Sequence, residues 1–435
     1  MKKQFFLFAI CFFAFANTKL VSQTLTLEAA ISEALNKNLG IKVLQNDLAI
    51  LKNNAVKNNA GFAPNINIIA SETPSFGFLN QKSSNGIEVN RSNIANNLNG
   101  GVQLTWLLYD GKRMFLEFDR LKELQGIGEI NFRLRTEQLV YDIMRAYYAI
   151  VRQQELYKSL GEQLNLYEER YRLAQLRLDA GKGNQLDVFQ AQSDLSVQQT
   201  QLLRQKQSID IAKSQLSLLM SNNTQTHRFD IIDTLVLSKT IDYTVLKNNL
   251  LSSNLNILLL KKQIGINIIV EKEIATLSKP RITFNSAFTV GRQDNTAGFF
   301  LFNQTTGLSA GLGLSYPIYD GGNVKRQVAN AKLETASNTL RMTQLQTDLQ
   351  NMLSILYQNY QNSLDILRGE ENNAAIAKQS IFIAMERFRL SRSTILELAQ
   401  MQQTYESAMF RAVNAKFDAK LFDIELLRLS GGLIR

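Results

Sequence analysis

The side chains able to do chemistry are few in this chain, and no group of them is arranged for catalysis. The single histidine, His227, has no second imidazole with which to hold a metal ion. No glycine-rich loop runs into Lys-Ser or Lys-Thr to cradle phosphates, and no Gly-x-Ser-x-Gly turn presents a nucleophile. Cys11, the single cysteine, lies in the N-terminal segment. We therefore expect no enzyme activity, no metal and no cofactor, so that any energy must come from a partner.

Acidic residues do recur at matching places, and this recurrence reveals an internal repeat. Leu186-Asp187-Val188 returns 210 residues later as Leu396-Glu397-Leu398. The same offset carries the stretch from Leu104 to Gly111 onto the stretch from Leu314 to Gly321. A repeat of this size indicates two copies of one structural unit. In each copy a strand-like stretch ends at an Asp-Gly pair, where a long helical pattern begins.

Alternating apolar and polar residues predict one β-hairpin in each copy, over 64–109 and 280–319. In the first hairpin a short strand begins at Asn65, and a polar loop is expected from about Asn80 to Asn97. Runs of about 9–11 residues suit tilted strands that cross a bilayer, although a half-buried strand in a soluble sheet alternates in the same way. The membrane is favoured by aromatic residues at one end of the strands, namely Trp106, Tyr109, Tyr316 and Tyr319.

Long helices are predicted after each hairpin, over 110–220 and 320–430. Apolar residues seven apart run from Val188 to Leu216 and from Leu398 to Leu426, a spacing typical of helices that coil around each other. Two aspartates at the strand–helix junctions are expected to cap these helices. The junction residues are Tyr109, Asp110, Gly111, Pro317, Tyr319, Asp320 and Gly321.

The N-terminus has the pattern of a secretory signal peptide, with Lys2 and Lys3 before an apolar run from Phe5 to Ala16. Cleavage after Ala16 and cleavage near Gln23 both fit. No apolar run of about 18 residues follows, so no transmembrane helix is expected, but an exported chain can still cross a membrane as a closed β-barrel. If the first 23 residues are removed, Lys2, Lys3 and Lys19 go with them and the net charge falls from +10 to 10 − 3 = +7. The remaining cations alternate with acids, which argues against nucleic-acid binding.

These patterns predict a mainly α-helical protein with a small β part, made of two internal repeats. Thr26 is expected to cap the first helix, which runs to about Ala60. The predicted segments are the signal peptide at 1–23, the first repeat at 24–220, a linker at 221–242 and the second repeat at 243–435.

The predicted strands are too few to close a membrane barrel within one chain. In lipid, an open sheet edge leaves backbone N–H and C=O groups unpaired at several kcal/mol each, and bacterial barrels have about eight strands or more. Two copies of the chain would give eight strands and a filled interior, whereas three would give twelve and room for a lumen. The small polar residues on one face of the strands favour the trimer, although the pattern alone also allows a dimer.

The order and spacing of four short motifs resemble the TolC-like outer-membrane efflux family over nearly the whole chain after the signal peptide. The motifs are Thr26-Leu27-Glu28-Ala29-Ala30, Tyr109-Asp110-Gly111, Tyr319-Asp320-Gly321-Gly322, and Ala180-Gly181 followed by Asp187-Val188 and Ala191. The resemblance implies a homotrimer with a twelve-stranded barrel among outer-membrane lipids and a long α-helical barrel through the periplasm. It also implies two partners, a periplasmic adaptor (membrane fusion) protein and an inner-membrane pump.

The same resemblance implies where this chain meets its adaptor and where its entrance narrows. The helical tips would be 179–185 and 389–395, with Ser391 in place of a tip glycine. The candidate adaptor contacts are Gly181, Lys182, Gly183, Leu390, Ser391 and Arg392. The candidate entrance ring is Asp187, Glu397 and Gln400. For both acids, an ordinary solvated or capping role near a turn is the alternative.

We therefore predict an outer-membrane channel that passively conducts substrates delivered by an adaptor and an inner-membrane pump. One alternative is a duct of the same type for protein or peptide export, as in type I secretion. Another is a secreted coiled-coil structural or adhesive protein, which explains the heptads but neither the alternating strands nor the duplicated Asp-Gly junctions.

Overall fold

The computed structural model describes residues 23–220, 229–237 and 241–433. The predicted signal peptide up to residue 22 and His227 lie outside the described residues. The chain forms two compact units, and each takes a part from either repeat. We call the unit made of 1–38, 142–237 and 362–421 the tip unit, and the unit made of 39–141, 238–361 and 422–435 the sheet unit.

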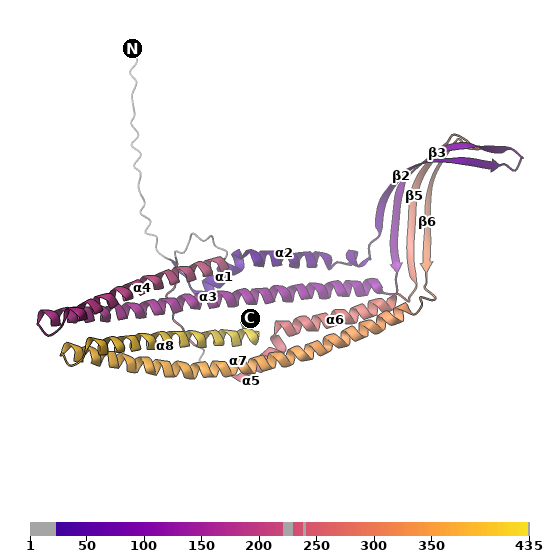
Figure 1. Cartoon of the computed structure of the whole chain (residues 1–435). Coiled ribbons are helices and arrows are strands. Elements are labelled where there is room, and N and C mark those ends of the chain that lie inside the picture. The colour runs from indigo at the N-terminus through magenta and orange to yellow at the C-terminus, as the bar shows by residue number, and fades with distance from the viewer. Residues whose placement is uncertain (1–22, 221–228, 238–240, 434–435) are drawn as a thin grey trace, which may run out of the picture. The chain divides into compact units, whose positions relative to one another are not determined.

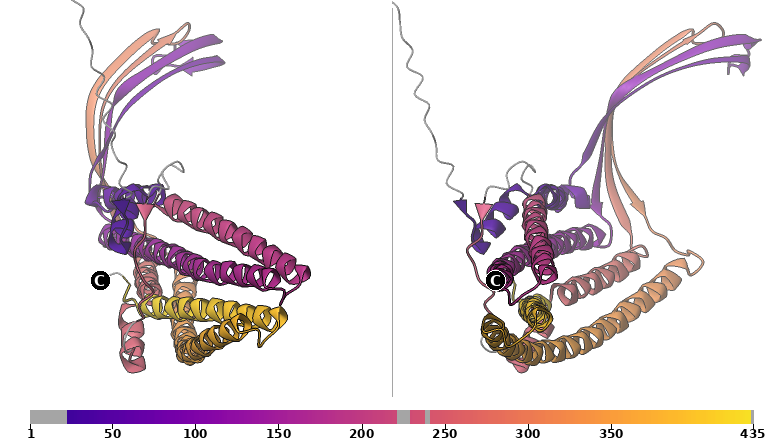
Figure 2. Two further views of the ribbon diagram at one scale, coloured as in Figure 1. Left: turned by 90° about the vertical axis from the view of Figure 1, so that its left-hand side faces the viewer. Right: turned by 60° about the vertical axis from the view of Figure 1, so that its left-hand side comes forward.

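The sheet unit contains a four-stranded antiparallel sheet in the order β2-β3-β5-β6 (Figures 1 and 2). Its strands are β2 (Asn65–Lys82), β3 (Glu88–Tyr109), β5 (Arg281–Asn295) and β6 (Phe302–Ser315). They are 18, 22, 15 and 14 residues long, so the predicted length of about 9–11 residues is too short.

The polar loop predicted from Asn80 to Asn97 is wrong. The backbone stays paired from Asn80↔Asn90 to Asn65↔Thr105, and the connection is the tight turn between Lys82 and Glu88. Polar side chains do not prevent pairing here, because the ladder is made by backbone groups. Gly86, with φ +83°, supplies the left-handed residue that this turn requires.

The register places the two kinds of side chain on opposite sides of the sheet. Residues directly opposite each other in an antiparallel pair point to the same side. One side is mostly apolar and includes the pairs Trp106↔Phe284, Phe284↔Leu312 and Ile282↔Leu314. The other carries small or polar residues in most pairs, including Asn65↔Thr105, Thr105↔Asn285 and Asn285↔Gly311. We call these the apolar side and the polar side.

The helix predicted from Thr26 to about Ala60 is interrupted. It is replaced by α1 (Leu27–Lys37), α2 (Leu39–Asn54) and the 3-10 helix η1 (Lys57–Ala60). Thr26 caps α1 as predicted, since its hydroxyl accepts the N–H of Ala29 at 3.2 Å. The break falls at Asn38, whose backbone is extended and whose amide donates to the carbonyl of Leu219 at 2.9 Å.

The second repeat has the same break, and no pattern in the sequence predicts it. There α5 (Tyr243–Ser253) ends before Asn254 and α6 (Leu255–Thr276) follows. Asn254 is extended, and its amide donates to the carbonyl of Leu429 at 3.0 Å. The Asn254 side chain also caps α6 by accepting N–H groups of its first turn. An asparagine therefore ties each short helix to the end of the last helix of its own repeat.

Four long helices complete the chain: α3 (Arg113–Asp179), α4 (Gln185–Leu219), α7 (Asn323–Arg389) and α8 (Ile395–Leu429). The ends of both predicted heptad runs are buried, with Val188 at 3% exposure and Leu216, Leu398 and Leu426 at 0%. Between these ends, Tyr405 and Ala419 are also buried, whereas Leu195, Leu202, Ile209 and Ala412 are half-buried. In the tip unit two residues, Gln23–Thr24 (β1), pair in parallel with Phe229–Asp230 (β4). Among the described residues, no helix carries an apolar stretch of the length that a bilayer crossing requires.

Candidate functional site

The two helix–helix turns of the tip unit have the same backbone hydrogen bonds. After α3, the N–H of Lys182 donates to the carbonyl of Arg177 at 2.8 Å, and the N–H of Gly181 donates to that of Leu178 at 2.9 Å. After α7, Arg392 donates to Arg387 at 2.8 Å and Ser391 donates to Phe388 at 3.0 Å. These pairs are the Schellman pattern, which ends a helix with one left-handed residue.

The left-handed residue is Gly181 in the first turn, with φ +68°, and Ser391 in the second, with φ +57°. The absence of the expected glycine therefore leaves the turn unchanged. Ser391 has a β-carbon, however, and the left-handed backbone crowds this atom at a conformational cost of about 1–2 kcal/mol. The remaining candidate tip contacts, Lys182, Leu390 and Arg392, are exposed, and Gly183 is half-buried.

The candidate ring residues lie just after these turns, with Asp187 in the first turn of α4, Glu397 in the first turn of α8 and Gln400 in its second. Asn184 caps α4 by accepting the N–H of Asp187 at 2.8 Å, and Thr394 accepts the N–H of Glu397 at 3.2 Å. Asp187 and Glu397 are therefore not the N-caps, although their charge suits the positive end of a helix. Glu397 and Gln400 share a groove of about 580 Å³ between α7 and α8, and Asp187 does not line it.

Arg177 joins the two tips within one chain. Its guanidinium lies over the ring of Phe388, 4.5 Å from the centroid, and donates to the carbonyl of Ser393 at 3.4 Å. Phe388 is 1% exposed and packs in a core with Leu398 and Leu173. Because the chain separation between Arg177 and Ser393 is 216 residues, the sequence carried no signal for this contact.

A buried arginine ties three helices of the tip unit together. Arg170 of α3 is 1% exposed, donates to the amide oxygen of Gln402 in α8 at 2.6 Å, and forms an ion pair with Asp194 in α4. Its guanidinium also lies 5.1 Å from the centroid of the Tyr167 ring. The hydroxyl of Tyr167 in turn donates to the carboxylate of Glu406 at 3.4 Å.

Burial sets the protonation of this last pair. It raises the pKa of Tyr167 to about 12, with a further contribution from the negative charge of Glu406. It also raises the pKa of Glu406, against the opposing effect of the hydrogen bond from Tyr167. Tyr167 therefore stays a hydroxyl donor at neutral pH.

At the strand–helix junctions, the two aspartates accept hydrogen bonds from the starts of α3 and α7. Asp110 accepts the N–H of Met114 at 3.0 Å, and Asp320 accepts those of Val324 at 2.7 Å and Gly322 at 2.9 Å. These bonds lower the pKa of Asp320, that from Val324 most strongly. Gly111 has φ +73°, and a β-carbon there would lie 2.5 Å from the β-carbon of Lys279.

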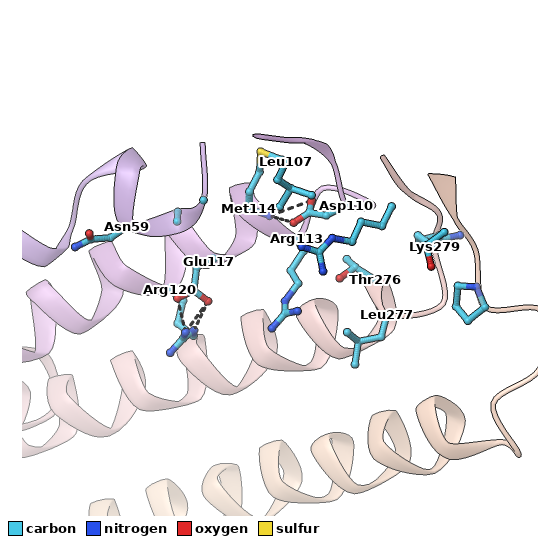
Figure 3. Close-up of a pocket in the computed structure, with 15 residues that line it drawn as sticks. Asn59, Leu107, Asp110, Arg113, Met114, Glu117, Arg120, Thr276, Leu277 and Lys279 are labelled. Atoms are coloured by element: carbon cyan, nitrogen blue, oxygen red, sulfur yellow. Dashed lines mark hydrogen bonds and ion pairs between the residues drawn. The ribbon is translucent and has the colours of Figure 1, made fainter. Parts of the chain in front are cut away.

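The aromatic residues at this end of the sheet are exposed. Trp106 is 40% and Tyr109 38% exposed, while Tyr316 and Tyr319 reach 59% and 89%. The indole N–H of Trp106 donates to the carbonyl of Phe62 at 3.0 Å. Pro317 and Asp110 line a cavity of about 570 Å³ in this region (Figure 3). Among the described residues, no cluster of three His, Cys, Asp or Glu is placed to hold a metal ion.

Comparisons with known proteins agree with this architecture. A family model described as "Outer membrane efflux protein" matches residues 30–222 and 277–432. Outer membrane efflux protein BepC of Brucella suis biovar 1 (strain 1330) is 21% identical over 335 residues, which cover 76% of this chain and 71% of BepC.

Solved structures share the fold at low sequence identity. VceC from Vibrio cholerae superposes with a TM-score of 0.74 at 16% identity, over 93% of this chain and 96% of VceC. A membrane protein from Pseudomonas aeruginosa gives 0.76 at 16% identity, over 93% of each chain. The open state of the MtrE outer membrane channel of Neisseria gonorrhoeae gives 0.67 at 14% identity, over 94% of this chain and 89% of MtrE.

Proposed function

The chain belongs to the outer membrane efflux protein family, and from that premise we propose that three copies of it form one passive exit duct. Its place is the outer membrane, and its helices extend into the periplasm. Substrates would be delivered by a periplasmic adaptor and an inner-membrane pump, and the pump would supply the energy. The duct itself performs no chemical reaction.

The observation that carries the proposal is the incompleteness of the sheet. The order β2-β3-β5-β6 leaves β2 and β6 each paired on one side only. The apolar side is exposed in the single chain, with Ile68 at 84%, Leu308 at 75% and Leu314 at 72%. Lipid would cover these side chains, but it cannot satisfy the backbone groups of the two edges. Joining β6 of one copy to β2 of the next removes every edge, and three copies give twelve strands.

The proposal assigns the polar side of the sheet to the lumen. Its small residues leave space for water, because twelve strands enclose more volume than their side chains fill. The apolar side then faces lipid, with the exposed aromatic residues Trp106, Tyr109, Tyr316 and Tyr319 at one membrane interface.

We assign the adaptor contact to the two tip turns, whose residues are Gly181, Lys182, Gly183, Leu390, Ser391 and Arg392. Leu390 is 61% exposed at the end of a helical hairpin, and Leu396 just after the same turn is 76% exposed, so apolar surface gathers at this tip. Lys182 and Arg392 are exposed beside it. A partner surface with an apolar pocket and acidic rim would complement both features.

We assign the entrance ring to Asp187, Glu397 and Gln400. Three copies would bring three Glu397 carboxylates around one axis, and a ring of carboxylates favours cations. Gln400, one turn further along α8, adds polarity without charge.

Conductance of the purified protein in a planar bilayer tests this ring. Wild type should form a pore whose reversal potential in a salt gradient shows cation preference, and Glu397→Ala should reduce that preference. Glu371→Ala, at an exposed position on α7, is the matched control and should behave as wild type. If selectivity is unchanged in Glu397→Ala, Glu397 does not belong to the ring.

A further inference from the structure

The cavity at the strand–helix junctions contains more positive charge than its neighbours neutralise. Four cations line it, namely Arg113, Arg120, Lys279 and Arg281, together with two acids, Asp110 and Glu117. Figure 3 shows several of these side chains between the start of α3 and the end of α6. The lining alone therefore has a formal charge of 4 − 2 = +2.

Both acids already have partners. The carboxylate of Asp110 accepts the N–H of Met114, and Glu117 forms an ion pair with Arg120 at 2.5 Å. Arg120 also contacts Glu273 at 3.1 Å, so its charge is balanced twice. The three remaining cations of the lining are Arg113, Lys279 and Arg281.

Arg113, Lys279 and Arg281 are exposed, and within the described residues none of them forms an ion pair with a carboxylate. Arg113 acts on Glu273 only through its charge, which lowers the pKa of that residue against the larger effect of burial. Three cations that line one cavity without an ion pair to a carboxylate attract anions.

The register shows which side of the sheet this cavity belongs to. Arg281 pairs with Ser315, and Leu107 pairs with Thr283, which pairs with Gly313. These positions alternate with the apolar pairs, so they lie on the polar side. Because Leu107, Arg281 and Ser315 line the cavity, it belongs to the polar side, away from the apolar side that lipid would cover.

We propose that this cavity binds organic anions that carry a carboxylate or phosphate group as they pass through the lumen. The placement in the lumen rests on the function proposed above. A volume of about 570 Å³ is within the range of small-molecule sites. Guanidinium groups bind carboxylate and phosphate oxygens in pairs, and the apolar lining from Leu107, Met114 and Leu277 can cover a small organic body.

The test is block of the pore current by two probes, citrate and inorganic pyrophosphate, in a planar bilayer of phosphatidylcholine. The variant Arg113→Gln/Arg281→Gln removes two of the three unpaired cations. The single variant Lys279→Gln removes the third, and it keeps the β-carbon and γ-carbon that pack against Gly111. The matched control is Arg292→Gln, on the same strand β5 but paired with Asp294 and outside the cavity.

Wild type and the control should be blocked at the same probe concentration. In both cavity variants the half-blocking probe concentration should rise by about tenfold or more, because each variant loses a charge-assisted hydrogen bond to the probe. Equal block in wild type and the cavity variants, or an open pore without block, would overturn the inference alone. Failure of the wild type to form any pore would overturn the proposed function and this inference with it.

A second bilayer, with phosphatidylglycerol added, distinguishes the source of the anion. If a lipid phosphate fills the cavity, block by pyrophosphate will disappear in this bilayer, and the assignment to passing solutes is wrong. If solutes reach the cavity from the lumen, the half-blocking concentration will be nearly the same in both bilayers.

Discussion

Of the charged side chains in the tip unit, Arg170 should be the one whose removal lowers stability most. The variant Arg170→Met keeps much of the side-chain length but has no donor. It leaves the oxygen of Gln402, a residue with 1% exposure, without its 2.6 Å hydrogen bond. An unsatisfied buried acceptor costs about 1–3 kcal/mol, and loss of one partner of a buried ion pair costs about 3–5 kcal/mol.

The expected total is smaller than the sum of these ranges, because the Asp194 side chain remains 27% exposed and water can solvate its carboxylate. We expect about 3 kcal/mol, which corresponds to a rise of about 100-fold in local opening. Hydrogen–deuterium exchange of peptides from α3, α4 and α8 around these three residues measures that opening.

The matched control lies two residues away on the same helix. Arg172 pairs with Glu169 but is 58% exposed, so Arg172→Met should leave the exchange rates of these peptides nearly unchanged. If both variants change exchange equally, or if Arg170→Met raises it less than about threefold, burial of this network does not hold α3, α4 and α8 together.

Three further predictions concern the tips, the buried acid and the repeated break. Ser391→Gly should slow hydrogen–deuterium exchange at the second tip, and Gly181→Ser should speed it at the first. Each change should correspond to about 1 kcal/mol, the strain of a side chain on a left-handed backbone. A shift in the reverse direction would be incompatible with the φ values of these two residues. Because the folded protein raises the pKa of Glu406, it holds this proton more tightly than the unfolded chain, and stability falls as pH rises from the ordinary glutamate range through the folded pKa. Glu406→Gln should therefore raise the melting temperature at pH 7 and give no gain near pH 4, whereas a gain of equal size at both pH values would exclude titration as the cause. Asn254→Ala, which removes the α6 cap and the bond to Leu429, should lower stability by about 1–3 kcal/mol in thermal unfolding, and an unchanged melting temperature would show that water replaces both.

Local sequence patterns predict much of the architecture, because strands and helices depend on the spacing of apolar side chains along the chain. Alternation of side chains specifies a strand with two different sides, and heptad spacing specifies a helix with a buried stripe. The Asp-Gly pairs marked the changes from strand to helix, where Asp110 and Asp320 accept backbone N–H groups. The 210-residue offset then related the two halves.

Features that depend on distant partners had no such signal. The polar residues from Asn80 to Asn97 predict a loop, yet most of them lie in paired strands, because backbone pairing does not depend on apolar side chains. The breaks at Asn38 and Asn254 depend on carbonyls at the ends of α4 and α8, and an asparagine within a helical pattern did not reveal them.

The candidate site was located by resemblance to a known family and not by the chemistry of its residues. Tip and ring residues do lie at the helical turns and just after them, but their contacts with an adaptor or with cargo remain proposals. The Arg170 network joins residues 232 positions apart, and spacing along the chain cannot predict such a contact. The exposure of Ser391 and Leu390 likewise depends on how the chain folds and cannot be predicted from residue type.

Native mass spectrometry of the protein, extracted gently from the outer membrane, tests most directly whether several chains share one barrel. Three chains in one particle, with no smaller species that keeps the folded sheet, is the predicted result. A single chain that remains folded in detergent, with β2 and β6 unpaired at their outer edges, would contradict the conclusion that the barrel must be shared.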